Sequence, residues 1–162
     1  MEHAPRLDRS ALVVDDDMFM LSALAEILGD DGFDVHTATN GFSGMRVALE
    51  QRPAVVLLDL ALPERSGKEL LEDLRADPIT HDIAIVVVTA HADRLTEWHR
   101  AEADGVVAKP FDIDDLLVTV QRALQKAATR RAEVAPVAAV THRGPSVRTR
   151  LPSAARRSRG RR

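Results

Sequence analysis

The chain has 162 residues, of which 45% are hydrophobic and only 3% aromatic, so its core must be built mainly from aliphatic side chains. It contains no cysteine, which excludes disulfides, thiolate zinc sites and cysteine nucleophiles. No apolar run approaches the roughly 18 residues of a membrane span, and residues 1–6 lack the apolar region of a signal peptide. These features predict a soluble, cytoplasmic protein.

The net charge of −3 is the sum of two unlike parts of the chain. Residues 1–125 contain 11 Lys and Arg against 24 Asp and Glu, a net charge of −13. Residues 126–162 contain 11 Lys and Arg against one acid, a net charge of +10. This second part is rich in Ala, Pro, Ser and Arg, a composition typical of disorder. We therefore expect a flexible N-terminus at residues 1–8, one folded domain at 9–125 and a disordered basic tail at 126–162.

Five short apolar runs alternate with five stretches of helical periodicity. The predicted strands are residues 11–14, 33–39, 55–58, 83–88 and 106–108. The predicted helices are residues 18–28, 43–51 and 68–75, one within 93–103, and one that begins after Asp112 and carries apolar residues as far as Leu124. Short connections and right-handed crossovers make the sheet parallel, with helices on both faces. The expected fold is α/β and flavodoxin-like, with strand order 2-1-3-4-5.

Capping residues mark several of the predicted helix ends. Asp17 and Asp112 precede the first and last helices, where a side-chain oxygen can accept hydrogen bonds from free backbone N–H groups. Gly32 is placed to end the first helix. Asn40 and Gly41 predict a turn between the second strand and the second helix.

Polar side chains stand where four of the predicted strands end. Asp15 and Asp16 follow the first strand, Asp59 the third, Thr89 the fourth and Lys109 the fifth. Because the carboxyl ends of parallel strands share one edge of the sheet, we expect these side chains to converge. Converging carboxylates repel one another unless a cation lies among them, and oxygen ligands favour a hard ion such as Mg²⁺. With an ammonium and a hydroxyl group nearby, the set suits phosphoryl transfer to a carboxylate.

Four motifs in this order closely resemble the receiver domain of two-component response regulators, over roughly residues 9–125. They are residues 13–17 (VVDDD), 59–67 (DLALPERSG), 88–90 (VTA) and 109–111 (KPF). Each motif alone is weakly specific, whereas all four in order at strand ends form a specific pattern. The resemblance implies a CheY-like phosphoprotein and signalling switch of a phosphorelay, not an enzyme beyond self-phosphorylation and slow autodephosphorylation.

The resemblance also implies how the acidic residues act. Asp59 is implied as the phosphoacceptor, which receives its phosphoryl group from a sensor histidine kinase or a phosphotransfer protein. Asp15, Asp16, Asp59 and the backbone carbonyl of Ala61 are implied as the Mg²⁺ site, with Asp16 a direct ligand and Asp15 a ligand through water. No other cofactor is implied.

Three further residues follow from the same resemblance. Lys109 is implied as the ion-pair partner of the phosphoryl group, and Thr89 as the hydroxyl that moves towards it. Pro110 is similar to a family proline that often follows a cis peptide bond. Val106, however, stands where the family commonly has Tyr or Phe. Because Val cannot swing between buried and exposed rotamers as a ring does, we expect switching to act mainly through the Thr89 loop.

Two residues near the implied site leave alternatives open. His91, two residues after Thr89, either orients an attacking water or faces solvent, and we favour solvent. Ala61 can play no such part, because it has no polar side-chain atom. Trp98 is expected to be a partly covered helix residue rather than a binding hot spot.

The basic tail allows two interpretations of how the protein passes on its signal. Residues 126–162 match no folded output domain, which favours a stand-alone receiver that signals through phosphorylation-dependent binding of an unknown downstream protein. The alternative is a nucleic-acid-binding regulator whose receiver gates the tail, which would bind polyanions weakly. A phosphatase of the haloacid-dehalogenase type is disfavoured, because Ala61 occupies the position where that family needs a second Asp. No membrane insertion is expected.

Overall fold

Five parallel strands form one sheet in the computed structural model, which describes residues 8–134. In sheet order they are β2 (Asp34–Ala38), β1 (Ser10–Val14), β3 (Val55–Leu58), β4 (Ala84–Thr89) and β5 (Gly105–Ala108). This order confirms the predicted flavodoxin-like topology. Val14 pairs with Leu58, and Thr89 pairs with Ala108. The residues that follow β1 and β3 therefore leave the sheet at the same level, as do the ends of β4 and β5.

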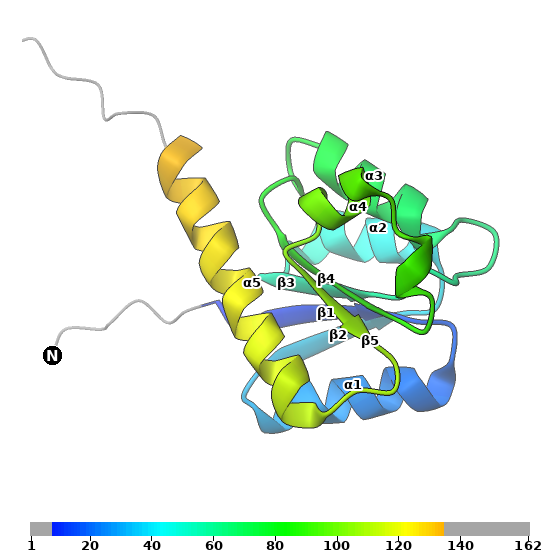
Figure 1. Cartoon of the computed structure of the whole chain (residues 1–162). Helices are drawn as coiled ribbons and strands as arrows, with labels where there is room; N and C mark the ends of the chain where they lie inside the picture. Colours follow the sequence, from blue (N-terminus) through cyan, green and yellow to red (C-terminus); the bar gives the residue numbers. More distant parts are fainter. Residues whose placement is uncertain (1–7, 135–162) are drawn as a thin grey trace, which may run out of the picture.

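Helices cover both faces of this sheet (Figure 1). One face carries α1 (Met18–Asp30) and α5 (Ile113–Val134), and the other carries α2 (Gly41–Gln51), α3 (Gly67–Ala76) and α4 (Glu97–Glu102). A short 3₁₀ helix, η1 (Ala92–Arg94), lies between β4 and α4. None of the helices in this part of the chain is long and apolar enough to cross a membrane.

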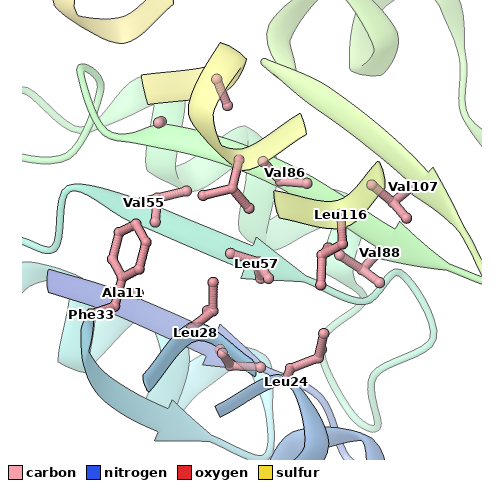
Figure 2. Close-up of a cluster of buried hydrophobic side chains, with 14 of the residues drawn as sticks. Ala11, Leu24, Leu28, Phe33, Val55, Leu57, Val86, Val88, Val107 and Leu116 are labelled. Carbon is pink, nitrogen blue, oxygen red and sulfur yellow. The ribbon is translucent and has the colours of Figure 1, made fainter. Parts of the chain in front are cut away.

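The central strands are apolar throughout because they are covered on both faces. Alternate residues of β1 face opposite layers: Ala11 and Val13 pack with α1 and α5, and Leu12 and Val14 pack with the helices of the other face. Figure 2 shows the first of these clusters, with Leu116 of α5 among the side chains of the strands. The core is aliphatic, as the composition predicted.

Side-chain caps fix where the first three helices begin. Asp17 accepts hydrogen bonds from two backbone N–H groups of α1, which confirms its predicted role. Asn40 accepts from the N–H of Ser43, so α2 begins at Gly41, two residues before the predicted start. Ser66 and Glu69 form a reciprocal capping box that starts α3 at Gly67. The sequence pattern for this box is present, but the prediction did not use it.

The helix predicted within residues 93–103 is confirmed as α4, and the 3₁₀ helix η1 precedes it with a break between the two. Leu95 is extended and buried, and the Thr96 side chain then caps a new helix by accepting from the N–H of His99. The break arises because Leu95 turns into the core between η1 and α4, which a periodicity pattern does not reveal.

The boundary predicted at residue 125 is wrong for residues 126–134, because these form the last part of α5. Tertiary contacts explain the difference. Lys126 Nζ donates to the backbone oxygen of Asp104 (3.2 Å), and Arg130 donates to both carboxylate oxygens of Asp104 (2.8 and 3.3 Å). Asp104 is buried, so its ion pair with Arg130 stabilises this last part of the helix. Residues 1–7 of the flexible N-terminus predicted at 1–8, and the rest of the predicted tail, 135–162, lie outside the described residues.

Candidate functional site

The predicted site residues at the ends of β1, β3 and β5 come together at one edge of the sheet. Lys109 Nζ donates to Asp15 Oδ2 (2.8 Å) and to Asp59 Oδ2 (3.1 Å). Asp15, Asp16 and Asp59 each offer a carboxylate oxygen, and these oxygens lie within 4.8 Å of one another. Asp15 and Asp59 are buried, while Asp16 is exposed. One ammonium group therefore bridges two buried carboxylates, with a third beside them.

Backbone hydrogen bonds hold the two buried carboxylates in position. The N–H of Asp59 donates to Val14 O (3.0 Å), which continues the pairing of β1 and β3 into the site. Asp15 Oδ1 accepts from the N–H of Asp17 (2.9 Å), and Asp59 Oδ1 accepts from the N–H of Ala61 (3.2 Å). Each carboxylate thus has one oxygen bound to its own loop and the other bound to Lys109.

Burial and ion pairing act in opposite directions on the charges of this site. Burial raises the pKa of Asp15, although the hydrogen bond from Lys109 opposes this shift. Burial by itself would lower the pKa of Lys109, but its hydrogen bonds to Asp15 and Asp59 outweigh that effect and raise the pKa above its ordinary value. Lys109 therefore stays protonated at neutral pH.

Thr89 lies at the end of β4, where it is fully buried. Its Oγ1 accepts from the N–H of His91 (3.1 Å), and its backbone oxygen accepts from the N–H of Lys109 (2.9 Å). The hydroxyl is thus engaged by its own loop, while the backbone ties this loop to Lys109. The Lys109–Pro110 peptide bond is cis, as the family resemblance predicted.

Gly67 allows α3 to begin directly behind Asp59. Its N–H donates to Leu60 O (3.0 Å). A Cβ at this position would lie 2.6 Å from Leu60 Cα and still closer to the backbone oxygen of Asp59. Only glycine fits against this stretch of backbone, so Gly67 fixes the path of the chain after Asp59.

The structure also shows where His91, Trp98 and Val106 lie. His91 is half-buried and lines a hollow of about 210 Å³ together with Ala61 and Arg94, so it does not simply face solvent. Trp98 is 45% exposed, which agrees with a partly covered helix residue. Val106 is half-buried and packs against the core on the side of α2 and α3.

Two sets of polar contacts on α3 were missed by the sequence analysis. His99 is buried in α4 and contacts Glu72 of α3. Arg75 donates to the Asp104 carboxylate (2.9 Å) and to the backbone oxygen of Glu102 (3.0 Å). Nothing in the sequence indicates that two arginines from distant helices, Arg75 and Arg130, meet Asp104.

Comparison with known proteins decides the family. Residues 11–121 match the family described as the response regulator receiver domain. The chain belongs to this family. Receiver domains act as phosphoacceptors in two-component signalling, and they are not typical enzymes.

Individual relatives agree with this assignment. The chain is 33% identical to the regulatory protein AtoC of Escherichia coli over 70% of its own length, and 30% identical to sporulation initiation phosphotransferase F of Bacillus subtilis over 73%. It spans 25% of AtoC but 95% of the phosphotransferase. Among solved structures, response regulator protein TrrA from Thermotoga maritima in complex with Mg²⁺ and BeF is 29% identical, with a TM-score of 0.66 over 71% of this chain and 98% of TrrA.

Adding one methyl group at Gly67 tests whether the close approach of α3 is required. We expect Gly67→Ala to lower the free energy of unfolding by about 2–3 kcal/mol, because the clash is with backbone atoms. Gly29→Ala is the matched control, because a Cβ there meets nothing within 4 Å. In a helix that change should raise stability by up to about 1 kcal/mol. Urea denaturation measures both, and equal effects would contradict the packing explanation.

Replacing Lys109 tests the bridge between the carboxylates. We expect Lys109→Met to lower the free energy of unfolding at pH 7, without divalent ions, by about 3 kcal/mol, because two buried carboxylates lose their counter-charge. The pKa of Lys109 is raised in the folded state, so its stabilisation is present below the ordinary value of 10.5 and is lost as the pH rises through the raised value. Denaturation at increasing pH should therefore bring wild type and variant together above pH 10.5. A difference that stays constant would contradict the ion-pair origin.

Proposed function

We propose that this chain is an Mg²⁺-dependent phosphoacceptor of a two-component phosphorelay, with Asp59 as the residue that is phosphorylated. The phosphoryl donor is the phosphohistidine of a sensor histidine kinase or a phosphotransfer protein. The observation that most supports this is the bridge from Lys109 to Asp15 and Asp59, at distances of 2.8 and 3.1 Å, with Asp16 beside them. It combines a nucleophilic carboxylate, a cation and further oxygen ligands at one place.

The donor set suits Mg²⁺ by its chemistry. Oxygens of Asp15, Asp16 and Asp59 lie within 4.8 Å of one another, and the backbone carbonyl of Ala61 is a fourth candidate ligand. These are hard ligands, and Mg²⁺ binds few protein groups because it keeps several waters. When bound, the ion supplies positive charge to the phosphoryl oxygens. The TrrA structure was solved with Mg²⁺ and BeF, which supports the same ion here.

The side chains of the site have separate roles in the transfer. An oxygen of Asp59 attacks the phosphorus, a new P–O bond forms, and the P–N bond to the donor histidine breaks with its electron pair on the departing nitrogen. The Lys109 ammonium neutralises charge on the phosphoryl oxygens. The Thr89 hydroxyl leaves its bond with the N–H of His91, which spans 3.1 Å, and donates to a phosphoryl oxygen instead.

The output follows from the charge added at Asp59. A phosphoryl group adds roughly −1.5 to −2 charges at neutral pH. We propose that the Thr89 loop carries the response, because Val106 cannot change rotamer as a ring does. The changed surface then binds a downstream protein. AtoC and the transcriptional regulator RpaA of Synechocystis are longer proteins, of which this chain spans 25% and 56%, so their activities are not transferred to it.

The central test is phosphorylation by a small phosphodonor. We expect wild type incubated with Mg²⁺ and such a donor to gain the mass of one phosphoryl group, and Asp59→Asn to gain none, because the amide is not a nucleophile. Intact-mass spectrometry measures this. Asp34→Asn, an exposed change at the start of β2, should behave as wild type. Omission of Mg²⁺ should prevent the reaction, and an unmodified wild type would overturn the proposal.

A second candidate function is the binding of polyanions by the basic C-terminal part of the chain. The favouring observation is its charge of +10 over residues 126–162. Because Lys126 and Arg130 are engaged with Asp104, the cations that matter for a partner are those after Val134, where the sequence has eight Arg and no Asp or Glu. Nucleic acid is the partner class that this charge suits, because regularly spaced phosphates bind arginine.

Truncation tests this second candidate. A chain that ends at Val134 keeps α5 complete, so its folding should match that of the full chain. We expect the full chain to bind duplex DNA at about 50 mM salt and to lose it near 200 mM, because binding releases counterions. The truncated chain should not bind at either salt concentration. Equal DNA binding by the two chains in a filter or anisotropy assay would exclude this role.

A further inference from the structure

The short helix α4 is held to the molecule largely by polar contacts. It spans six residues, and its buried residue is His99, which is 6% exposed. By contrast, α3 buries Leu70, Leu71 and Leu74. Because apolar burial supplies most of the energy that seats a helix on a sheet, α4 is weakly held by packing alone. Leu95 and Ala103, which are buried just before and just after the helix, anchor the chain on either side of α4. The seating of the helix between these two anchors depends on what His99 binds.

Both ring nitrogens of His99 have partners. Nε2 lies 3.0 Å from Glu72 Oε1 on α3, and Nδ1 lies 2.6 Å from Thr96 Oγ1 at the start of α4. In the neutral ring one nitrogen donates to Glu72 while the other accepts the Thr96 hydroxyl, and in the protonated ring both nitrogens donate. The contact with Glu72 is therefore kept in either state of the ring.

The contact between His99 and Glu72 can open at little cost in stability. The Glu72 side chain is 54% exposed, so water competes for its carboxylate, and exposed pairs of this kind contribute little to stability. The second polar link between these helices, from Arg75 to the backbone oxygen of Glu102, holds only the far end of α4. Release of His99 would therefore free the first turn of α4 while its end stays attached.

The segment before α4 connects it to the candidate site. Thr89 ends β4, its hydroxyl accepts from the N–H of His91, and η1 then leads through Leu95 into α4. If the Thr89 hydroxyl turns towards a phosphoryl group, His91 loses its partner and the start of this segment must adjust. That adjustment acts on Thr96 and His99 at the other end of the segment.

We propose that Glu72 and His99 form a latch that seats α4 on α3, and that opening of this latch carries the change at Asp59 to the surface of α4. The coupling rests on the proposed phosphorylation of Asp59. Glu72 and His99 are positioning residues, because they touch neither phosphoryl group nor metal ligand. The latch defines a resting state in which the outer face of α4 is fixed.

The protein contains its own reporter for this latch. Trp98 is the one tryptophan in the chain, and its ring packs edge-on against His99, with centroids 5.2 Å apart and planes at 88°. Its fluorescence therefore responds to movement of His99 without any added label. Amide hydrogen exchange gives a second, independent measure of opening, resolved along the chain.

The test compares Glu72→Ala, Glu72→Gln and the exposed control Glu50→Ala in the full chain. We expect Glu72→Ala to speed exchange in α4 by about two- to five-fold, the range of an exposed pair, and to change Trp98 fluorescence. Exchange in β1, β3 and β4 should stay unchanged. Glu72→Gln keeps an acceptor oxygen and should restore most of the protection. Equal acceleration in the central strands, or none in α4, would overturn the latch.

Phosphorylation provides the second arm of the test. Wild type treated with Mg²⁺ and a small phosphodonor should show the same local exchange and fluorescence changes as unphosphorylated Glu72→Ala, and phosphorylation of that variant should add little. Phosphate on Asp59 with unchanged α4 exchange would overturn the coupling alone. Absence of phosphate on wild type would overturn the proposed function and the coupling with it, while the exchange results on Glu72 variants would still stand.

Discussion

The Lys109 ammonium group is the counter-ion of two buried carboxylates. It lies 2.8 Å from Asp15 and 3.1 Å from Asp59. These residues are 94 and 50 positions away in sequence, and only the parallel sheet brings them together. Without a cation at this point, carboxylates at the ends of neighbouring strands would repel one another and disfavour the fold that assembles them. The charge balance at this edge of the sheet and the candidate chemistry both depend on this contact.

A close approach of backbone to backbone provides the second constraint. Gly67 lies against the backbone of Asp59 and Leu60, and the Ser66–Glu69 capping box fixes the start of α3 beside it. The N–H of Ala61 therefore holds the carboxylate of Asp59, and the start of α3 packs against its backbone. Rigid surroundings suit a nucleophile that must meet a donor in one orientation.

The sequence predicted the sheet and the convergence of the site because both follow from local rules. Apolar runs marked the strands, and residues that end parallel strands meet at one edge, which placed Asp15, Asp59 and Lys109 together. Helix ends were less well predicted. The residue types that cap helices at Asn40 and Ser66 can be recognised in the sequence. The break at Leu95, between η1 and α4, depends on a side chain that turns into the core.

Contacts between distant helices lie beyond what such rules can predict. Asp104, Arg75 and Arg130 are widely separated in sequence, yet the two arginines meet around the buried carboxylate of Asp104. No feature of the sequence sets His99 apart, because its partner Glu72 comes from another helix, α3. Each depends on the packing of one helix against another, which neither periodicity nor charge counts encode.

The contacts of Lys126 and Arg130 with Asp104 also fix the direction of α5. This helix begins at Ile113, soon after Lys109, and its 22 residues extend about 33 Å along the body of the domain (Figure 1). Val134 therefore lies at the end of the molecule remote from the carboxylates. A partner that binds the last turn of α5 would therefore leave the approach to Asp59 open.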